Sequence, residues 1–224
     1  MRTHNDNDEG MFDDLLATEM PQGLAVRGEL PRVLVAIVGT RTPSTDASEA
    51  AFTVAKVLAR AGIGVVSGLA LGIDAAAHRG CLAGSGRTVA VLGHGLQAPL
   101  YPPQHAGLAE VIANHGALVS PFTADVPLNR KTLLARNKWI AGLAQAVWVV
   151  QTAVPGGALA AAAHARHLGI PVLTTPWDEP RWQAGFQSLL SHGAESVDVI
   201  TAAVRLQALC ARPVSPVDQG VLAL

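Results

Sequence analysis

The chain has 224 residues, of which 50% are hydrophobic, 15% charged and 4% aromatic, and its formal net charge at pH 7 is −1. This apolar content and length suffice for one domain with a sizeable core, which excludes intrinsic disorder for most of the chain. The apolar runs are interrupted every few residues and only two cysteines are present, so neither a membrane-spanning helix nor a disulfide framework is expected.

The charges divide unevenly along the chain. Residues 1–20 contain six acids and one base, and the remainder contains 15 bases and 11 acids. We expect residues 1–30 to form an acidic, flexible arm on a mildly basic body. The arm lacks the basic start and apolar core of a signal peptide, so we expect a cytoplasmic protein.

From residue 31 onward, short apolar runs alternate with helical patterns. The runs are rich in β-branched residues, which is typical of strands buried on both faces of a parallel sheet. The predicted strands are VLVAIV (33–38), GIGVVSG (62–68), RTVAVLG (87–93), ALVS (117–120), AVWVVQ (146–151), PVLTTP (171–176) and a short VDVI (197–200). Helices are predicted over 42–62, 72–84, 105–116, 132–144, 157–169, 183–194 and 201–211, with a possible capping box at Asp46 and Glu49.

This alternation predicts an α/β fold, an extended Rossmann-like, doubly wound and mostly parallel sheet with helices on both faces. One domain is expected over residues 31–204, followed at 205–224 by the end of a helix and a tail. Ligands of such sheets bind beyond the carboxyl ends of the strands.

The loops at those ends are rich in Gly, Ser and Thr and lead into helices, which favours binding of phosphate. Gly68 and Gly72 would let the backbone approach a phosphate, and Arg41 would add charge-assisted hydrogen bonds. The alternative is that these glycines only serve tight turns. Neither a dinucleotide fingerprint nor a Walker A loop is present, so no cofactor is expected.

A second cluster places Arg130, Lys131, Arg136 and Lys138 within nine positions, next to Trp139 and with no acid among them. Basic side chains beside an aromatic ring are typical of sequence-tolerant binding of single-stranded nucleic acid. The alternative is a solvated helix face with the tryptophan in the core.

Several stretches resemble one family closely. They are AIVGTRTPS (36–44), VVSGLALGIDAAAHRGCL (65–82), the segment 88–122 and LLARNKWIAGLAQAVWVVQ (133–151). They are similar to the DprA/Smf family, DNA-processing protein A, over about residues 31–200. The resemblance implies a Rossmann-like domain that binds single-stranded DNA in natural transformation and recombination, helps load a RecA-type recombinase and commonly forms homodimers.

Carried over residue by residue, the resemblance assigns strand or phosphate binding to seven positions and adds five possible pocket residues. The seven are Arg41, Ser67, Gly68, Gly72, Arg136, Asn137 and Lys138. The five are Gly39, Asp74, Gly156, Gly157 and Trp177.

The sequence departs from the family pattern at several of these loops. Leu71 stands where the family has arginine, and PGGAL (155–159) lacks two family serines, at Gly156 and Ala158. Trp177 replaces a glycine and either fills part of the pocket or offers a stacking surface. The ends are too short for the family's helical and winged-helix modules, so we expect a core-only member.

Two other functions stay open. The same loops could hold a nucleotide in a sensor module, and PGG at 155–157 is similar to part of the lonely-guy phosphoribohydrolase signature. That signature's glutamate is missing, and Asp74 is interpreted as a helix cap rather than a base, so no catalytic residue is expected. His164 and His167 have no third ligand at metal spacing, and His78 is expected to pack or hydrogen-bond, so no metal is expected.

Overall fold

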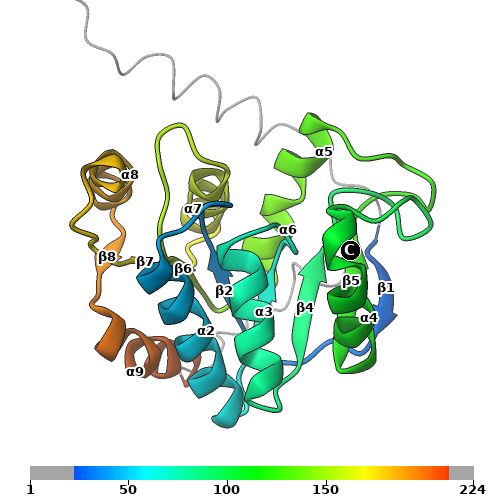
Figure 1. The fold of residues 1–224 in the computed structure, drawn as a ribbon, viewed down its shortest axis with the longest axis horizontal. Coiled ribbons are helices and arrows are strands. Elements are labelled where there is room, and N and C mark those ends of the chain that lie inside the picture. Colours follow the sequence, from blue (N-terminus) through cyan, green and yellow to red (C-terminus); the bar gives the residue numbers. More distant parts are fainter. Residues whose placement is uncertain (1–22, 212–224) are drawn as a thin grey trace, which may run out of the picture.

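The computed structural model of the chain describes residues 23–211 (Figure 1). Within this range eight strands form one sheet in the order β1-β5-β4-β3-β2-β6-β7-β8. Neighbouring strands are parallel except β1 and β5, which are antiparallel. The strands are β1 (Ala25–Gly28), β2 (Leu34–Val38), β3 (Gly64–Ser67), β4 (Thr88–Val91), β5 (Gly116–Ser120), β6 (Ala146–Val149), β7 (Val172–Thr174) and β8 (Glu195–Ser196). The predicted mostly parallel α/β fold is confirmed.

Helices cover both faces of the sheet, as predicted. In Figure 1, α2, α3, α4 and α9 lie in front, while α6 and α7 lie behind. Within residues 23–211, every helix is too short or too polar to cross a lipid bilayer. The helices are α2 (Thr45–Arg60), α3 (Ile73–Ala83), the 3-10 turn η1 (Pro103–His105), α4 (Ala106–Asn114), α5 (Arg130–Ala135), α6 (Asn137–Gly142), α7 (Gly157–His167), α8 (Pro180–Ser191) and α9 (Val199–Cys210).

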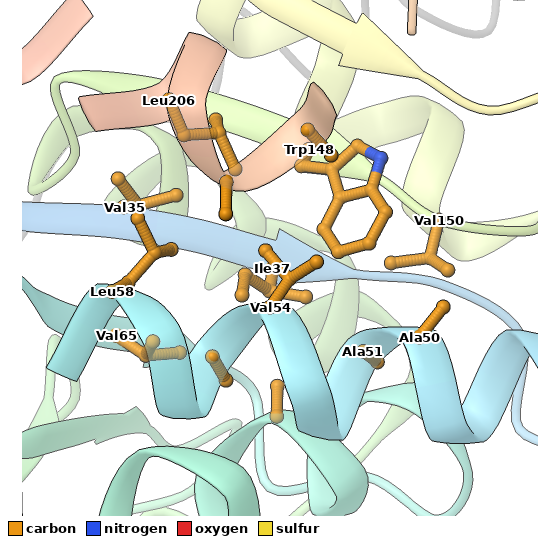
Figure 2. Packing of buried hydrophobic residues seen from close by; sticks show 14 of the residues in the cluster. Val35, Ile37, Ala50, Ala51, Val54, Leu58, Val65, Trp148, Val150 and Leu206 are labelled. Atoms are coloured by element: carbon orange, nitrogen blue, oxygen red, sulfur yellow. The ribbon is translucent and has the colours of Figure 1, made fainter. Parts of the chain in front are cut away.

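The core consists of apolar layers on either side of the central strands. On β2, Val35 and Ile37 pack into the layer under α2 and α9, whereas Ala36 and Val38 pack into the layer under α7. Figure 2 shows Trp148 of β6 beside Ile37, in the layer that Leu206 of α9 completes. The indole Nε1 of Trp148 donates to the Thr175 hydroxyl at 3.0 Å, so the one polar atom of this side chain is satisfied.

The boundary of the N-terminal arm differs from the prediction. Residues 1–22 lie outside the described residues, but Ala25–Gly28 form β1, so the expected arm to residue 30 is wrong at its end. All four residues of β1 are exposed, and they carry no apolar alternation that could have revealed a strand. Pairing with β5 and an ion pair between Arg27 and Glu110, at 2.6 Å, hold the strand in place.

Four other predicted boundaries also differ from the structure. The N-cap of α2 is Ser44, whose hydroxyl accepts from the N–H of Ala47 at 3.3 Å, so the capping box at Asp46 is wrong. The expected strand over 197–200 is wrong because Asp198 caps α9 by accepting from the N–H of Thr201 at 2.8 Å. Helix α9 (Val199–Cys210) therefore continues past residue 204, where we expected the domain to end. The expected helix over 132–144 divides into α5 and α6 at Arg136.

His78 on α3 is fully buried and is hydrogen-bonded, as predicted. Its Nδ1 lies 2.7 Å from the hydroxyl of Thr88, which itself donates to the carbonyl of Val65 at 2.8 Å. The hydroxyl has one hydrogen, so Nδ1 is the donor to Thr88. Burial, followed by the charges of His105, Arg136 and Arg79, lowers the pKa of His78 from 6.5 to about 3.

This lowered pKa predicts acid sensitivity of the fold. In the unfolded chain His78 becomes protonated below pH 6.5, whereas in the folded chain it becomes protonated only near pH 3. The His78 contribution to the free energy of unfolding should therefore fall as pH falls through this window, by at most about 1.4 kcal/mol per pH unit. Urea unfolding of wild type and His78→Gln across pH 3 to 7 measures how the free energy of unfolding of each protein depends on pH. An equal slope for both proteins would contradict the prediction.

Candidate functional site

A cavity of about 310 Å³ lies at the carboxyl edge of the sheet, between the loops that follow β2 and β6. Strand β2 stands between β3 and β6, so the chain winds away from it in both directions, and this switch point is where such sheets leave a crevice. Seven of the twelve predicted site residues line the cavity. They are Gly39, Arg41, Asp74, Arg136, Asn137, Gly156 and Gly157.

A buried amide joins the two loops that flank the cavity. The side chain of Gln151 accepts from the N–H of Ser44 at 2.9 Å and donates to the Ser44 hydroxyl at 3.0 Å. The carbonyl of Gln151 also accepts from the N–H of Thr40 at 2.8 Å. Sequence reasoning did not identify this residue. The available signal was a polar side chain directly after the apolar strand β6.

Arg136 is the central cation of the site and is only 7% exposed. Its Nη1 donates to the carbonyl of Val91 at 2.8 Å and to the carbonyl of Gly68. These contacts join the carboxyl ends of β3 and β4. The Nε of Arg136 has no hydrogen-bond partner among the described residues. Burial lowers the pKa of Arg136, and the charge of Asp74 opposes that effect.

Asp74 is buried near the start of α3 and accepts two backbone hydrogen bonds. They come from the N–H groups of Gly68 at 3.1 Å and Ala70 at 3.3 Å. Asp74 therefore caps the preceding turn, whereas the N-cap of α3 itself is Gly72 without a side-chain bond, so the expected helix cap is wrong in its target. Burial raises the pKa of Asp74, and Arg136 opposes this.

Helix α7 begins at the cavity. Its N-cap, Gly156, offers no side-chain hydrogen bond to the first turn. The side chain of Asn137 donates to the carbonyl of Gly157 at 3.2 Å and fixes the start of the helix against α6. The first N–H groups of α7 are thus left for a ligand, and the helix dipole favours an anion there.

The charges around the cavity favour the same ligand. Arg41 is exposed on one rim, Arg136 lies in the wall, and Asp74 is the one carboxyl among the residues that line the cavity. A phosphate oxygen can accept from a guanidinium and from backbone N–H groups at once. The charges and free backbone donors of this cavity therefore favour an anionic ligand, and its volume of about 310 Å³ has room for a small molecule.

Two predicted residues, Ser67 and Gly68, are occupied by contacts within the protein. The Ser67 hydroxyl donates to the carbonyl of Ile37 at 2.6 Å. Gly68 donates its N–H to Asp74 and accepts from Arg136. Neither residue lines the cavity, and the groups named above are engaged within the protein.

Three further predicted residues lie outside the cavity. Gly72, with φ +78°, packs under the β2 loop, where a Cβ would stand 2.4 Å from the carbonyl oxygen of Thr40. Lys138 is partly buried, and its charge adds to burial in lowering the pKa of His164 to about 4. Trp177 packs against the core, with its Nε1 donating to the carbonyl of Val150 at 2.6 Å. The expectation that Trp177 fills or stacks over the pocket is therefore wrong.

The predicted basic cluster does not form one patch. Arg130 and Lys131 are exposed on α5, Lys138 is partly buried, and Arg136 is buried in the cavity wall. Trp139 is partly buried against the apolar layer under α7. Of the four predicted bases, Arg136 alone lines the cavity.

Comparison with known proteins supports the resemblance. The family model for DNA recombination-mediator protein A matches residues 9–207. Protein Smf of Synechocystis is 40% identical over 172 residues, which are 76% of this chain and 42% of that protein. A putative DNA processing protein DprA of Mycobacterium tuberculosis is 42% identical over 163 residues, which are 72% of this chain and 42% of that protein. The chain thus spans less than half the length of these curated relatives.

A solved structure shows the same fold. It is that of DNA processing protein A from Helicobacter pylori, described with its single-stranded DNA binding mode. The two chains are 26% identical with a TM-score of 0.77, over 88% of this chain and 92% of the other.

The role of Arg136 as a structural clamp is testable. Arg136→Met leaves the carbonyls of Gly68 and Val91 without their donor and Asp74 without its nearby cation. We expect the free energy of unfolding to fall by about 2–3 kcal/mol in urea titrations. Arg130→Met, on the exposed face of α5, serves as the matched control and should stay within about 0.5 kcal/mol of wild type. Equal stability of Arg136→Met and the control would contradict the clamp.

Proposed function

The chain belongs to the DNA recombination-mediator protein A family, and from this premise we propose that it binds single-stranded DNA with a backbone phosphate in the cavity at the sheet switch point. The cavity supplies charge and free donors for a phosphate. The strand is held by its backbone, so binding is tolerant of sequence.

One observation carries the proposal. The uncapped first turn of α7 opens onto the cavity whose wall contains the guanidinium of Arg136. Backbone N–H groups without a side-chain cap, beside a positive charge, favour an anionic ligand. Arg41 on the rim adds a second positive charge.

Duplex DNA is a poorer fit to this site. The cavity is lined by the loops after β2 and β6 and by residues of α3, α5, α6 and α7, so its donors lie recessed between these elements. A flexible single strand can bring a phosphate into such a cavity, whereas a duplex presents its phosphates on a stiff cylinder. The modest positive excess of the body also implies a moderate affinity that weakens with salt.

A mononucleotide is the second candidate. The cavity volume of about 310 Å³ falls in the range of small-ligand sites, and the same donors would hold its phosphate. An enzymatic reading has less support, because the carboxylate of Asp74 already accepts two backbone N–H groups. The wider roles, in DNA uptake, transformation and loading of a RecA-type recombinase by a cytoplasmic homodimer, are proposals that rest on family membership.

The strand proposal is tested by titrating a fluorescent oligothymidylate at several salt concentrations, beside duplex DNA and mononucleotides. We expect Arg41→Ala to raise the Kd for the strand about tenfold at low salt and to reduce the salt slope by about 0.7, the loss of one phosphate contact. Lys138 lies outside the cavity, so Lys138→Ala should reduce affinity for the strand less than Arg41→Ala does.

Arg166→Ala is the matched control, because this exposed arginine lies in the last turn of α7, away from the cavity. Its Kd should equal that of wild type. Tight nucleotide binding without strand binding would overturn the proposal.

The acidic N-terminus supplies a second prediction. Strand β1 is antiparallel to β5, with Ala25 beside Ser120, so the chain enters the sheet at the same edge as the cavity. Residues 1–20 carry six acids and one base. Deleting them should tighten strand binding at low salt, because like charges near a site repel phosphate, and the gain should fade as salt screens it.

A chain of unchanged length, with the six acids replaced by Asn and Gln, is the control for charge against bulk. It should reproduce the gain of the deletion. An unchanged Kd in both variants would refute an effect of the acidic segment.

A further inference from the structure

A groove of about 680 Å³ lies between the first turns of α2 and α3 and is closed at one side by η1. It is separate from the cavity of the phosphate site, since the two share no lining residue. The contact between α2 and α3, which lie side by side in Figure 1, explains its shape. A Cβ on Gly80 of α3 would stand 2.1 Å from the carbonyl oxygen of Phe52, so the helices touch by their backbones there. The groove opens beyond this contact, toward the carboxyl edge of the sheet.

The groove and the cavity are close neighbours. Gly72 lines the groove, and a Cβ on it would lie 2.4 Å from the carbonyl oxygen of Thr40 and 2.7 Å from the carbonyl carbon of Arg41. Thr40 and Arg41 line the cavity. The backbone of Thr40 and Arg41, packed against Gly72, therefore separates the two spaces. A nucleic-acid strand that passes over Arg41 can reach both.

The chemistry of the groove differs from that of the cavity. Phe52, Ala75, Ala76 and the half-exposed Leu71 give it apolar surface. Its charged residues, Glu49 and Arg79, are opposite in sign, and neither forms an ion pair within residues 23–211. A neutral site with an aromatic ring is a poor place for a phosphate and a suitable one for a flat heterocycle.

Polar groups at the groove can read the edge of such a ring. His105 is buried, and its Nδ1 lies 2.8 Å from the carbonyl of Leu69, which can only accept. Nδ1 is therefore the donor to Leu69, and Nε2 is the other polar atom of the ring. Gln104 adds an amide and Glu49 a carboxylate at the groove. This set offers both acceptors and donors for the amino and carbonyl groups of a base.

We propose that the groove between α2 and α3 is a nucleobase subsite, which holds a base of the single strand whose phosphate lies in the neighbouring cavity. Phe52 supplies the stacking surface, and Arg41 is the point over which the strand passes from one space to the other. The inference rests on the proposed function, because it needs a strand at the cavity.

The first test uses the wild-type protein and needs no variant. The shortest oligothymidylate that still binds with full affinity, and so has one register, is compared with strands of the same length that carry one abasic position, moved stepwise. We expect one position to matter, with the Kd about tenfold higher when its base is missing. A 2-aminopurine at that position should lose fluorescence on binding. Equal affinity of all abasic strands overturns the subsite and leaves the phosphate site standing.

The second test assigns the base to the groove. Phe52→Leu keeps an apolar side chain of similar size but removes the ring. It should abolish the preference for a base at the critical position and leave affinity for the abasic strand unchanged. Phe186→Leu, a partly buried phenylalanine on α8 that lines neither space, is the matched control and should behave as wild type. A base preference that persists in Phe52→Leu overturns the subsite.

The proposed function fails in a different way. If no oligonucleotide binds and Arg41→Ala changes nothing, the strand itself is excluded, and the subsite falls with it. A mononucleotide that binds as tightly as the strand, with the same loss in Phe52→Leu, would assign the groove to a free nucleotide and overturn the strand as its source.

Discussion

The buried guanidinium of Arg136 is the contact on which the carboxyl edge of the sheet depends. It donates to the backbone carbonyls of Gly68 and Val91 at the ends of two neighbouring strands. Its positive charge also favours the charged form of the buried Asp74. Asp74 in turn holds the turn after β3 through two backbone N–H groups. A charge removed from water must be compensated, so this small network fixes the loops around it and is also the wall of the cavity.

The same residues explain why the site is built for an anion. A buried guanidinium, a helix that starts without a side-chain cap and an exposed arginine all line one space. None of these alone makes a site. Their convergence follows from the topology, because β2 and β6 are neighbours in the sheet although more than a hundred residues lie between them in the chain. The buried amide of Gln151 keeps their two loops in register.

Two positions at which this sequence departs from the family pattern, Gly156 and Leu71, lie at the cavity and at the neighbouring groove. Gly156 stands at the start of α7, where a hydroxyl is absent, so backbone N–H groups are left as the donors. Leu71 is exposed at the rim of the groove beside the cavity, where it adds apolar surface in place of charge. In the proposed binding mode, buried donors and apolar contact would therefore contribute more than surface charge, which agrees with the net charge of −1.

The sequence by itself determined the fold class and most of its elements. Short β-branched runs such as 33–38 alternate with helical patterns, and this periodicity reflects local geometry and burial on both faces of a parallel sheet. It also located seven residues of the cavity, because the carboxyl ends of parallel strands must share one edge. It missed β1, whose four exposed residues are held by pairing with a strand far along the chain.

Only the tertiary structure decided which site residues are free. Ser67, Lys138 and Trp177 carry groups that could bind a ligand. The Ser67 hydroxyl donates instead to the carbonyl of Ile37 in β2, Trp177 donates to the carbonyl of Val150 just after β6, and Lys138 lies outside the cavity. Arg136 belongs to a basic run in the sequence, but only its position under two strand ends makes it a buried clamp. The physical reason is that a hydrogen bond depends on distance in space, and spacing along the chain does not report which partner reaches a group first.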